Sequence, residues 1–474
     1  MTTKKLTKIS APIQRTLSDM LHNVPLILAI VNEIKRHAGR VLLVGGGVRD
    51  LLLGIATNDF DCEVHDISLE QLEEILQRFG PVSLVGKSFG VLRVHGLDVD
   101  WSVPRRDSAG RKPRVVIDEQ MTVEQAFVRR DLTMNAMGID LITHELFDPF
   151  NGEEDLKNKI LRAPDANLFV EDPLRFYRVM QFISRFDAEP DKQLSALCAT
   201  MDLRGISIER IEAEFEKMLL RSKEPSRGIR WLKQIGRLSE LLPELGATVG
   251  IAQEHSWHPE GDVFEHSMQA LDAAALLPCD NDEHKLILLF ASLCHDLGKA
   301  TTSRVIDGRI RSLEHAQAGV APTRQLLRRI ITKKSVIDQV AVLVRWHMEP
   351  GQFVANGAGI AAYKRLAKKI APDLNLHMLA QLTLSDRRGR NPDSHKPLQI
   401  AAPDVDAFIK KAEQAHVTFH AEEPLLHGRD LLDAVEKGPK MGMLLKKAYE
   451  LQIDEDIHDK DELKKRVLQL LTKK

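Results

Sequence analysis

The sequence predicts an α+β protein in which a compact α/β head is followed by an all-helical body. Over residues 40–154, short apolar runs closed by glycine alternate with segments of helical spacing. From Asp155 onward nearly every segment has helical spacing, and no strand alternation is convincing. The 474 residues are 43% hydrophobic and 28% charged, a composition that excludes general disorder and allows about three domains with cores of their own.

Changes in the spacing of apolar residues along the chain predict the elements of the leader and of the head. A leader, residues 1–39, carries two short helices separated by Pro25. The head, residues 40–154, is expected to contain the following elements: a strand at 41–44, a glycine turn at 45–47, a helix at 48–53, a strand at 60–64, a helix at 69–79, and a strand at 91–102 that changes phase near Gly96.

The body is predicted to have three helical parts. A neck covers residues 155–245 and ends near Pro243 and a glycine-rich stretch at 246–250. A second domain covers 246–395, and a tail covers 396–474 after a cluster of prolines at 390–403.

Charge and cysteine usage limit the classes of function. The chain has 66 Lys and Arg against 68 Asp and Glu, so a polyanion would have to meet local basic patches. Residues 204–237 and 324–345 are candidate patches, although a solvated helical face explains them as well. The four cysteines form no CxxC pair, which fits a reducing cytoplasm, and no apolar run reaches the ~18 residues of a membrane span.

Two carboxylates in the head predict a metal site. Asp59 and Asp61 flank Phe60 in an expected strand, so both point to one face while Phe60 points to the core. Asp100, on the later strand, is a candidate third acid. Mg²⁺ prefers oxygen ligands together with substrate phosphates, which suits attack on a nucleotide α-phosphate. By itself a D-x-D pattern is also typical of a solvated strand face.

Two neighbouring strings could supply the nucleotide contacts. Gly46, Gly47 and Arg49 offer backbone N–H groups and a guanidinium where a triphosphate could lie, although a tight turn before a helix has the same pattern. The second string consists of Arg129, Arg130 and Asp131. Its cations and its acid suit contacts with phosphate and ribose hydroxyl groups, although surface ion pairing also explains these residues.

A third group lies at the start of an expected helix. Asp172 and Arg175 are three residues apart, so both project from one side of the helix. The carboxylate of Asp172 accepts hydrogen bonds, and the guanidinium of Arg175 donates several. Asp172 before Pro173 is also typical of a helix cap, and the two roles are compatible. Arg178 lies one turn further and is a further candidate for nucleotide binding.

These motifs together resemble the tRNA nucleotidyltransferase and poly(A) polymerase family, which includes the bacterial CCA-adding enzymes. LVGGGVRDLLLG, NDFDCEV, DVDWSVPR, RRDLTMNAM, FDPFNGEEDL and EDPLRFYRVMQF occur in that family's order over about residues 40–245. The resemblance implies a polymerase-β-like head in which Asp59 and Asp61 hold Mg²⁺ and Asp100 assists. It also implies that Arg129, Arg130 and Asp131 bind ribose and phosphate. Asp172 and Arg175 would read the bases of CTP and ATP.

Histidines and aspartates in the body predict a second metal site. His295 and Asp296 end an apolar helix, His266 precedes them, and His315, His347 and Asp386 follow. Imidazole and carboxylate ligands suit a divalent ion that activates water against a phosphoester. This order resembles the HD superfamily of metal-dependent phosphohydrolases. We interpret His255 and His258 as structural.

A subgroup of bacterial CCA-adding enzymes carries such a domain, and WHPEGDVFEHS, CHDLGK and SDRRGR match it in order. The resemblance implies His266, His295, Asp296 and Asp386 as ligands of Ni²⁺, Co²⁺, Mn²⁺ or Mg²⁺, with His315 and His347 as further candidates. It also implies 2′,3′-cyclic phosphodiesterase, 2′-nucleotidase and phosphatase activity.

The expected function is therefore addition of CCA to tRNA from CTP and ATP, by a cytoplasmic enzyme without a membrane segment. A poly(A) polymerase shares the head motifs, but VGKSFG at 85–90 departs from the arginine-containing string of that branch. A CC-adding or A-adding specialist also fits the motifs, and a non-catalytic tRNA-binding scaffold is disfavoured because both sets of acids are present. The sequence leaves open the oligomeric state, the metal of the second site, and the roles of leader and tail.

Overall fold

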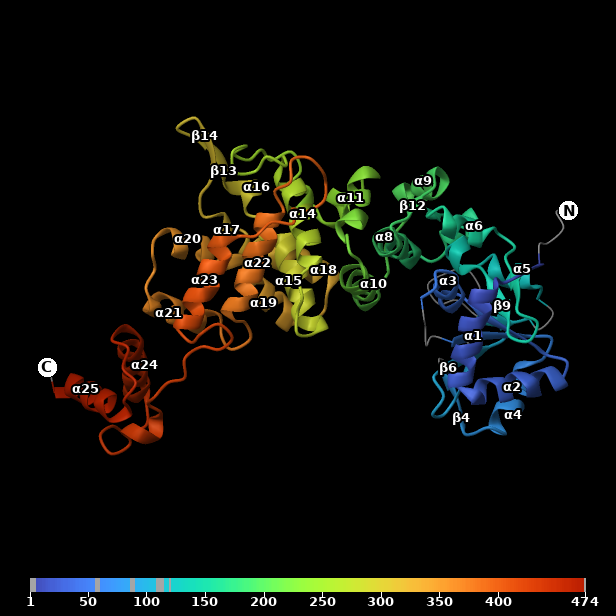
Figure 1. Cartoon of the computed structure of the whole chain (residues 1–474), viewed down its shortest axis with the longest axis horizontal. Helices are drawn as coiled ribbons and strands as arrows, with labels where there is room; N and C mark the ends of the chain where they lie inside the picture. The colour runs from blue at the N-terminus through green and yellow to red at the C-terminus, as the bar shows by residue number, and fades with distance from the viewer. Residues whose placement is uncertain (1–5, 56–59, 86–89, 108–114, 119–120, 473–474) are drawn as a thin grey trace. The chain divides into compact units, whose positions relative to one another are not determined.

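The computed structural model describes residues 6–55, 60–85, 90–107, 115–118 and 121–472 (Figure 1). The chain forms two compact units. The N-terminal unit comprises Met1–Met218 with Gln234–Arg237, and the C-terminal unit comprises Leu219–Lys233 with Leu238–Lys474.

An eight-stranded sheet forms the base of the N-terminal unit, in the order β1-β10-β9-β2-β3-β6-β5-β4. Its strands are β1 (Leu6–Lys8), β2 (Arg40–Val44), β3 (Phe60–His65), β4 (Val82–Val85), β5 (Val91–Val94), β6 (Val99–Ser102), β9 (Gly138–Asp140) and β10 (Glu145–Phe147). Neighbouring strands are antiparallel except β3 and β6, which run parallel. Two further strand pairs are β7 (Arg105–Asp107) with β8 (Val115–Ile117), and β11 (Ile160–Leu161) with β12 (Glu189–Pro190).

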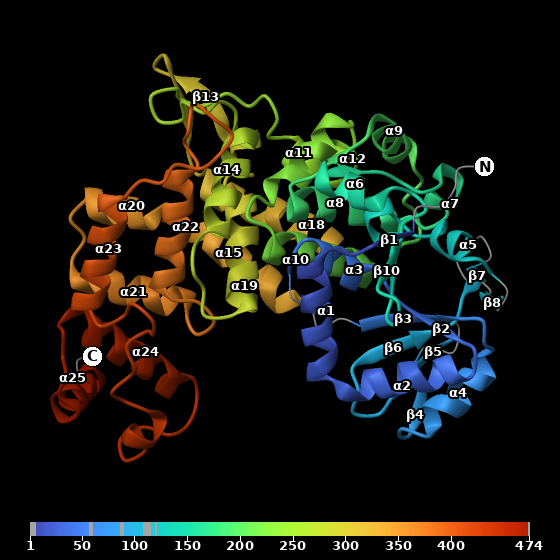
Figure 2. The same ribbon diagram turned by 45° about the vertical axis from the view of Figure 1, so that its right-hand side comes forward.

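The helices of this unit confirm the two-helix leader. It forms α1 (Ala11–Asn23) and α2 (Pro25–Arg36), with Pro25 in the first turn of α2, where its missing N–H costs no hydrogen bond. Helix α2 and α4 (Leu69–Gln77) lie side by side against the sheet (Figure 2). The other helices are α3 (Gly46–Leu52), α5 (Val123–Phe127), the 3₁₀ turn η1 (Thr133–Asn135), α6 (Gly152–Lys157), α7 (Ala166–Phe169), α8 (Leu174–Phe186), α9 (Lys192–Thr200) and α10 (Ile208–Arg221), whose last residues, from Leu219 on, belong to the C-terminal unit.

The single strand expected over residues 91–102 is wrong. The structure has two antiparallel strands, β5 and β6, with Leu92 opposite Trp101. Gly96, at φ +81°, lies in the turn between them, in a conformation that favours glycine. The change of phase in the sequence was therefore the signal of a hairpin.

The C-terminal unit is a helical assembly around a central apolar helix, α15 (Asp282–Cys294), which is buried without interruption from Leu286 to Cys294. Three helices pack against it: α14 (Val263–Ala275), α19 (Lys334–Trp346) and α22 (Leu376–Arg388). The others are α11 (Ser226–Gln234), α12 (Leu238–Leu241), α13 (Pro243–Gly246), α16 (Lys299–Thr302), α17 (His315–Ala318), α18 (Val320–Ile330), α20 (Glu349–Ala355), α21 (Ile360–Ile370), α23 (Pro403–Gln414), the 3₁₀ turn η2 (Gly428–Leu431), α24 (Pro439–Asp454) and α25 (Lys460–Thr472). The described residues include no helix of the length and apolarity that a membrane crossing requires.

The α+β class is confirmed, but the expectation of no strand after Asp155 is wrong. Besides β11 and β12, the body contains a hairpin of β13 (Ser303–Ile306) and β14 (Arg309–Ser312). Its two-residue turn is Asp307 and Gly308, at φ +51° and +74°, a pair typical of a tight hairpin turn. The Asp-Gly dipeptide was the sequence signal for it.

Candidate functional sites

Asp61 and Asp100 lie next to each other in the head. Strands β3 and β6 are parallel and in register, with Asp61 opposite Asp100. Phe60 and Cys62 alternate with Asp61 and are buried, so the aspartate faces the other way. Both carboxylates line a cavity of about 260 Å³. Asp59 lies outside the described residues.

Cations surround this acidic face. Arg93 of β5 is ion-paired with Asp100. Arg129, Arg130 and Arg175 line the same cavity. The structure therefore brings two predicted acids and three predicted arginines together around one hollow.

Glu63 belongs to this face, and the sequence reasoning missed it. It is buried two residues beyond Asp61, within 3.6 Å of Arg129 Nη2 and 3.7 Å of Arg130 Nη2. Burial opposes its charge, but a hydrogen bond with His65 and the two guanidinium groups bring the pKa of Glu63 below its ordinary value. The alternation D-x-D-x-E could have found it.

Arg175 is held rigidly at the cavity. Its Nη1 donates to the Leu168 carbonyl at 2.7 Å, and its Nη2 donates to the Arg129 carbonyl. Two main-chain acceptors from different segments thus fix the direction of its planar fork. Asp172 lies outside the cavity lining: its carboxylate accepts the Leu174 N–H at 3.1 Å and lies 3.1 Å from Arg210 Nη2.

Asp131 is a buried anchor. It accepts hydrogen bonds from the Leu132 N–H at 2.8 Å, from Asn135 Nδ2 at 3.0 Å and from Arg178 Nε at 2.6 Å. Burial would raise its pKa, but Arg178 and these donors lower it to about 2. Arg178 is thus paired with Asp131 and is not part of the cavity lining.

The glycine turn approaches the acidic face, whereas Arg49 does not. A Cβ on Gly45, which has φ +68°, would lie 3.0 Å from Arg130 Nη1 and 3.8 Å from Asp61 Oδ2. Gly46 and Gly47 then begin α3. Arg49 is buried, donates to Asp50 and Asn135 at 2.8 Å each, and stacks on Phe186.

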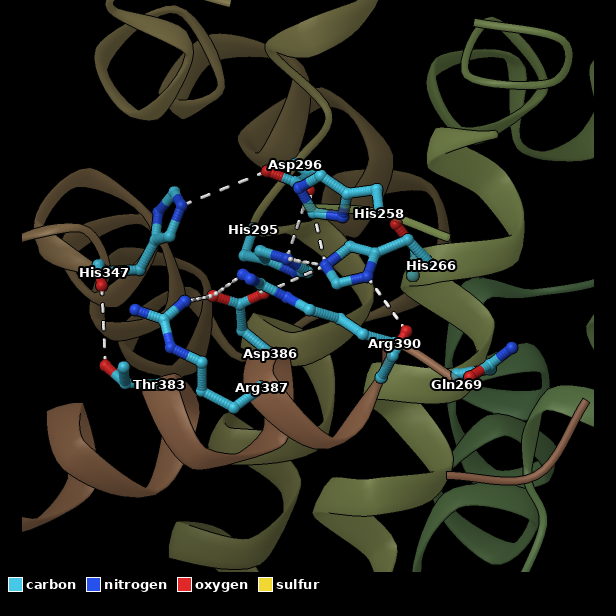
Figure 3. A network of polar contacts seen from close by, with 12 residues as sticks. His258, His266, Gln269, His295, Asp296, His347, Thr383, Asp386, Arg387 and Arg390 are labelled. Atoms are coloured by element: carbon cyan, nitrogen blue, oxygen red, sulfur yellow. Dashed lines mark hydrogen bonds and ion pairs between the residues drawn. The ribbon is translucent and has the colours of Figure 1, made fainter. Parts of the chain in front are cut away.

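In the C-terminal unit, six predicted side chains on or next to five helices converge at one buried centre, and Figure 3 shows five of them: His266, His295, Asp296, His347 and Asp386. His266 is on α14, His295 and Asp296 follow α15, and His347 follows α19. The remaining two are His315, which begins α17, and Asp386 on α22. All six are buried.

The centre consists of two adjacent groups of ligand atoms. One is His266, His295 and Asp386, with His266 Nε2 at 3.1 Å from both His295 Nε2 and Asp386 Oδ1. The other is Asp296, His315 and His347. Asp296 spans both groups: its Oδ1 is 3.3 Å from His315 Nε2, and its Oδ2 is 3.3 Å from His295 Nε2.

The backbone orients all four imidazoles. Each Nδ1 contacts a main-chain carbonyl: His266 that of Gly389 at 3.0 Å, His295 that of Ser292 at 2.8 Å, His315 that of Ser312 at 2.7 Å, and His347 that of Val344 at 2.6 Å. A carbonyl only accepts, so each Nδ1 carries the proton. In the neutral ring, Nε2 therefore presents a lone pair to the centre, as a metal ligand requires.

The two carboxylates of the centre are held in the charged form. Burial opposes ionisation of Asp296 and Asp386, but cations and imidazoles hold the pKa of each well below its usual range. Two of these cations are Lys299, 2.7 Å from Asp296 Oδ2, and Arg390, 2.8 Å from Asp386 Oδ1.

The imidazoles differ in their affinity for a second proton. Burial, followed by the neighbouring His315 and His295, lowers the pKa of His347 to about 3, so this ring is neutral. Burial also opposes protonation of His266, but hydrogen bonds with Asp386 and Glu260 raise its pKa to about 9. A metal ion bound at His266 would therefore displace a proton from Nε2.

Lys299 and Glu260 are site residues that the sequence reasoning missed, although CHDLGK and WHPEGD contain them. Glu260 Oε1 lies 2.7 Å from His266 Nδ1 and 3.0 Å from His258 Nδ1. His258 Nε2 faces Lys299 Nζ at 3.3 Å. His258 therefore borders the centre, whereas His255 is exposed.

The basic stretches are largely engaged in contacts within the fold. Arg237 is buried and donates to the carbonyls of Cys198 and Met201 at 3.0 Å each. Arg230 is paired with Glu265, and Arg324 with Asp338. These arginines hold helices together, so their role as tRNA contacts stays a prediction.

Family models match most of the chain. A poly A polymerase head domain matches residues 41–162, a probable RNA and SrmB-binding site of polymerase A matches 192–248, and an HD domain matches 263–375. A multifunctional CCA protein of Xanthomonas euvesicatoria is 31% identical over 424 residues, which is 86% of this chain and 97% of that protein. One of Pasteurella multocida is 34% identical over 65% of this chain and 74% of its own.

Solved structures share the fold. A CCA-adding enzyme in complex with ATP has a TM-score of 0.65 at 21% identity and covers 99% of this chain and 100% of its own. The Thermotoga maritima CCA-adding enzyme complexed with tRNA has a TM-score of 0.61 at 19% identity, over the same shares of the two chains.

Proposed function

Because this chain belongs to the multifunctional CCA protein family, we propose that it adds the 3′-terminal CCA to tRNA from CTP and ATP. The observation that supports this most is the in-register pair of Asp61 and Asp100 at a cavity lined by three arginines. In the reaction, the 3′ oxygen of tRNA forms a bond to the α-phosphorus, and the bond to the departing pyrophosphate breaks.

The acidic pair fits a Mg²⁺ ion. Adjacent carboxylates repel unless a cation neutralises them, and in this structure a guanidinium neutralises Asp100. Asp61 and Asp100, with Asp59 before them, would supply the oxygen ligands that Mg²⁺ prefers. A bound ion would polarise the α-phosphate and stabilise the charge that develops in two-metal transfer.

The arginines of the cavity would bind the rest of the nucleotide. Arg129 and Arg130 line the cavity and approach the buried Glu63, and their guanidinium groups would donate hydrogen bonds to phosphate oxygens. The guanidinium of Arg175, which two main-chain carbonyls hold in place, would donate hydrogen bonds to a base edge. Asp172 would join it by exchanging Arg210 for the base.

We further propose that the histidine centre is a metal-dependent phosphohydrolase acting on 2′,3′-cyclic nucleotides and related phosphomonoesters. Four imidazoles and two carboxylates converge there, a donor set that fits one or two ions such as Ni²⁺, Co²⁺, Mn²⁺ or Mg²⁺. A bound ion would lower the pKa of a water molecule. Lys299, Arg387 and Arg390 would counter the charge of the phosphate.

The first activity is tested with tRNA that ends before CCA, given CTP and ATP separately and together. We expect two C residues with CTP alone and complete CCA with both. Asp61→Asn should abolish addition, while the matched control Asp98→Asn, whose side chain is 91% exposed, should not. Addition of only C, of only A, or of a run of A would contradict the proposal in favour of a specialist or a poly(A) polymerase.

The second activity is tested by hydrolysis of 2′,3′-cyclic AMP after loading with each of the four metals. Asp386→Asn should remove hydrolysis and leave CCA addition intact. Wild-type protein that hydrolyses nothing with any metal would contradict a phosphohydrolase at this centre.

A further inference from the structure

The cavity at the histidine centre has an unusual mouth. It measures about 340 Å³ and is lined by His295, Asp296 and Asp386. Large apolar side chains that solvent reaches also line it: Trp257 is 66% exposed and Leu313 is 63% exposed. An indole so exposed beside a charged centre gains little from the fold itself.

Hydrogen bonds fix the position of the segment that carries the tryptophan. The main-chain N–H of Trp257 donates to the Glu254 carbonyl at 2.9 Å. The Glu254 carboxylate in turn accepts the Ile310 N–H at 3.3 Å. The loop that carries the indole is thus joined to the β13–β14 hairpin, and residues on both sides of this junction line the cavity.

The charges around the cavity suit a phosphate. Arg387 and Arg390 approach Asp386, and Lys299 approaches Asp296 (Figure 3 shows the two arginines). Arg311 of β14 also lines the cavity, and its guanidinium makes no ion pair with the residues that the structure describes. One cavity is thus lined by the candidate metal ligands, by cations that suit a phosphate, and by exposed apolar and aromatic side chains.

We propose that Trp257 stacks on a nucleobase, with Leu313 as a further apolar contact, so that this centre selects nucleoside phosphoesters over phosphoesters without a base. The inference rests on the proposed phosphohydrolase centre for the position of the phosphate. Stacking of a base on an aromatic ring tolerates any base, because every base has a π face. The site therefore recognises nucleotides as a class.

The test measures binding by calorimetry, without turnover. Full-length wild type is titrated with adenosine 2′-monophosphate and with methyl riboside 2-phosphate, which has the same sugar phosphate and no base. Trp257→Ala should weaken binding of the nucleotide about tenfold or more and leave binding of the base-free compound within twofold. Trp257→Phe should restore most of the difference. Val305→Ala is the control, because Val305 is a 73% exposed apolar residue of the β13–β14 hairpin that does not line the cavity.

Kinetics give an independent readout. For 2′,3′-cyclic AMP, Trp257→Ala should raise KM about tenfold and leave kcat within twofold, because the indole does not touch the reacting atoms. Equal binding of the nucleotide by wild type and Trp257→Ala, or an equal loss for both compounds, would overturn the proposal. If no hydrolysis occurs with any metal but Trp257 still discriminates in calorimetry, the phosphohydrolase fails while the base site stands.

Discussion

Gly298 makes the arrangement of the histidine centre sensitive to a single methyl group. It precedes α16, and a Cβ at this position would lie 2.0 Å from the His315 carbonyl oxygen and 2.6 Å from the Gly319 nitrogen. Ordinary contacts of a Cβ begin at 3.4 Å. Both obstructing atoms are backbone, so neither can rotate away. Gly298→Ala must therefore change the distance between the segment of Gly298 and α17 by about 1 Å or more.

The displacement acts directly on a predicted metal ligand. His315 begins α17, and its Nε2 lies 3.3 Å from Asp296 Oδ1. A shift of about 1 Å at a catalytic group costs on the order of 10²-fold in rate. Overpacking of this kind also costs about 1–3 kcal/mol of stability.

We expect Gly298→Ala to lose about 100-fold in hydrolysis of 2′,3′-cyclic AMP and to bind less metal, measured by elemental analysis after dialysis. CCA addition, assayed on the same preparation, should stay within twofold of wild type. Gly359→Ala is the matched control, because a Cβ there meets no atom within 4 Å. Wild-type metal content and hydrolysis in Gly298→Ala would refute the reasoning that α17 carries a ligand.

Three further outcomes are expected. Asp296→Ala should remove cyclic phosphodiesterase activity but spare CCA addition, and loss of both activities in a folded variant would contradict separate sites. Arg175→Ala should disturb the choice among CTP, ATP, UTP and GTP in single-nucleotide addition, at a cost of about 1–3 kcal/mol for the correct base; a change in thermal stability alone would indicate a structural role. Asp131→Asn should cost about 2 kcal/mol of unfolding free energy at neutral pH in urea titrations, because burial raises the pKa of Asp131 but Arg178 and the hydrogen-bond donors outweigh burial and lower it to about 2. Since that pKa is lowered, the stabilisation is present above about pH 4 and lost as the pH falls towards 2, so the difference from wild type should shrink over this window.

The sequence predicted the elements of the head best where a short local pattern of residues identifies the element. Alternation around Phe60 indicated the direction of Asp61, and the glycine run indicated the turn before α3. The pairing of β3 with β6 depends on contacts between segments about 40 residues apart, which no local pattern encodes. Short strands such as β1 and β9 were missed because three residues are too few to show alternation.

Individual side chains of the head were harder to assign than its elements. Arg49 follows a glycine turn, as a phosphate-binding residue would, yet it is buried against Asn135 and Phe186. Asp172 and Arg175 share one side of a helix start, but only Arg175 lines the cavity. Spacing fixes which side of a helix a residue occupies, whereas the choice among several nearby partners is decided by tertiary packing.

Ion pairs within the N-terminal unit balance the charge of three predicted functional acids. Asp100 holds Arg93, Asp172 holds Arg210, and Asp131 holds Arg178. Each pair joins a predicted functional acid to a guanidinium, so each of the three carboxylates has a counter-charge within the fold. Binding of a nucleotide would then exchange one charged partner for another, which costs less than removing an unpaired charge from water. Partly exposed pairs such as Asp172 with Arg210 are the easiest to exchange, whereas the buried Asp131 pair would persist and position the helix that carries Arg175.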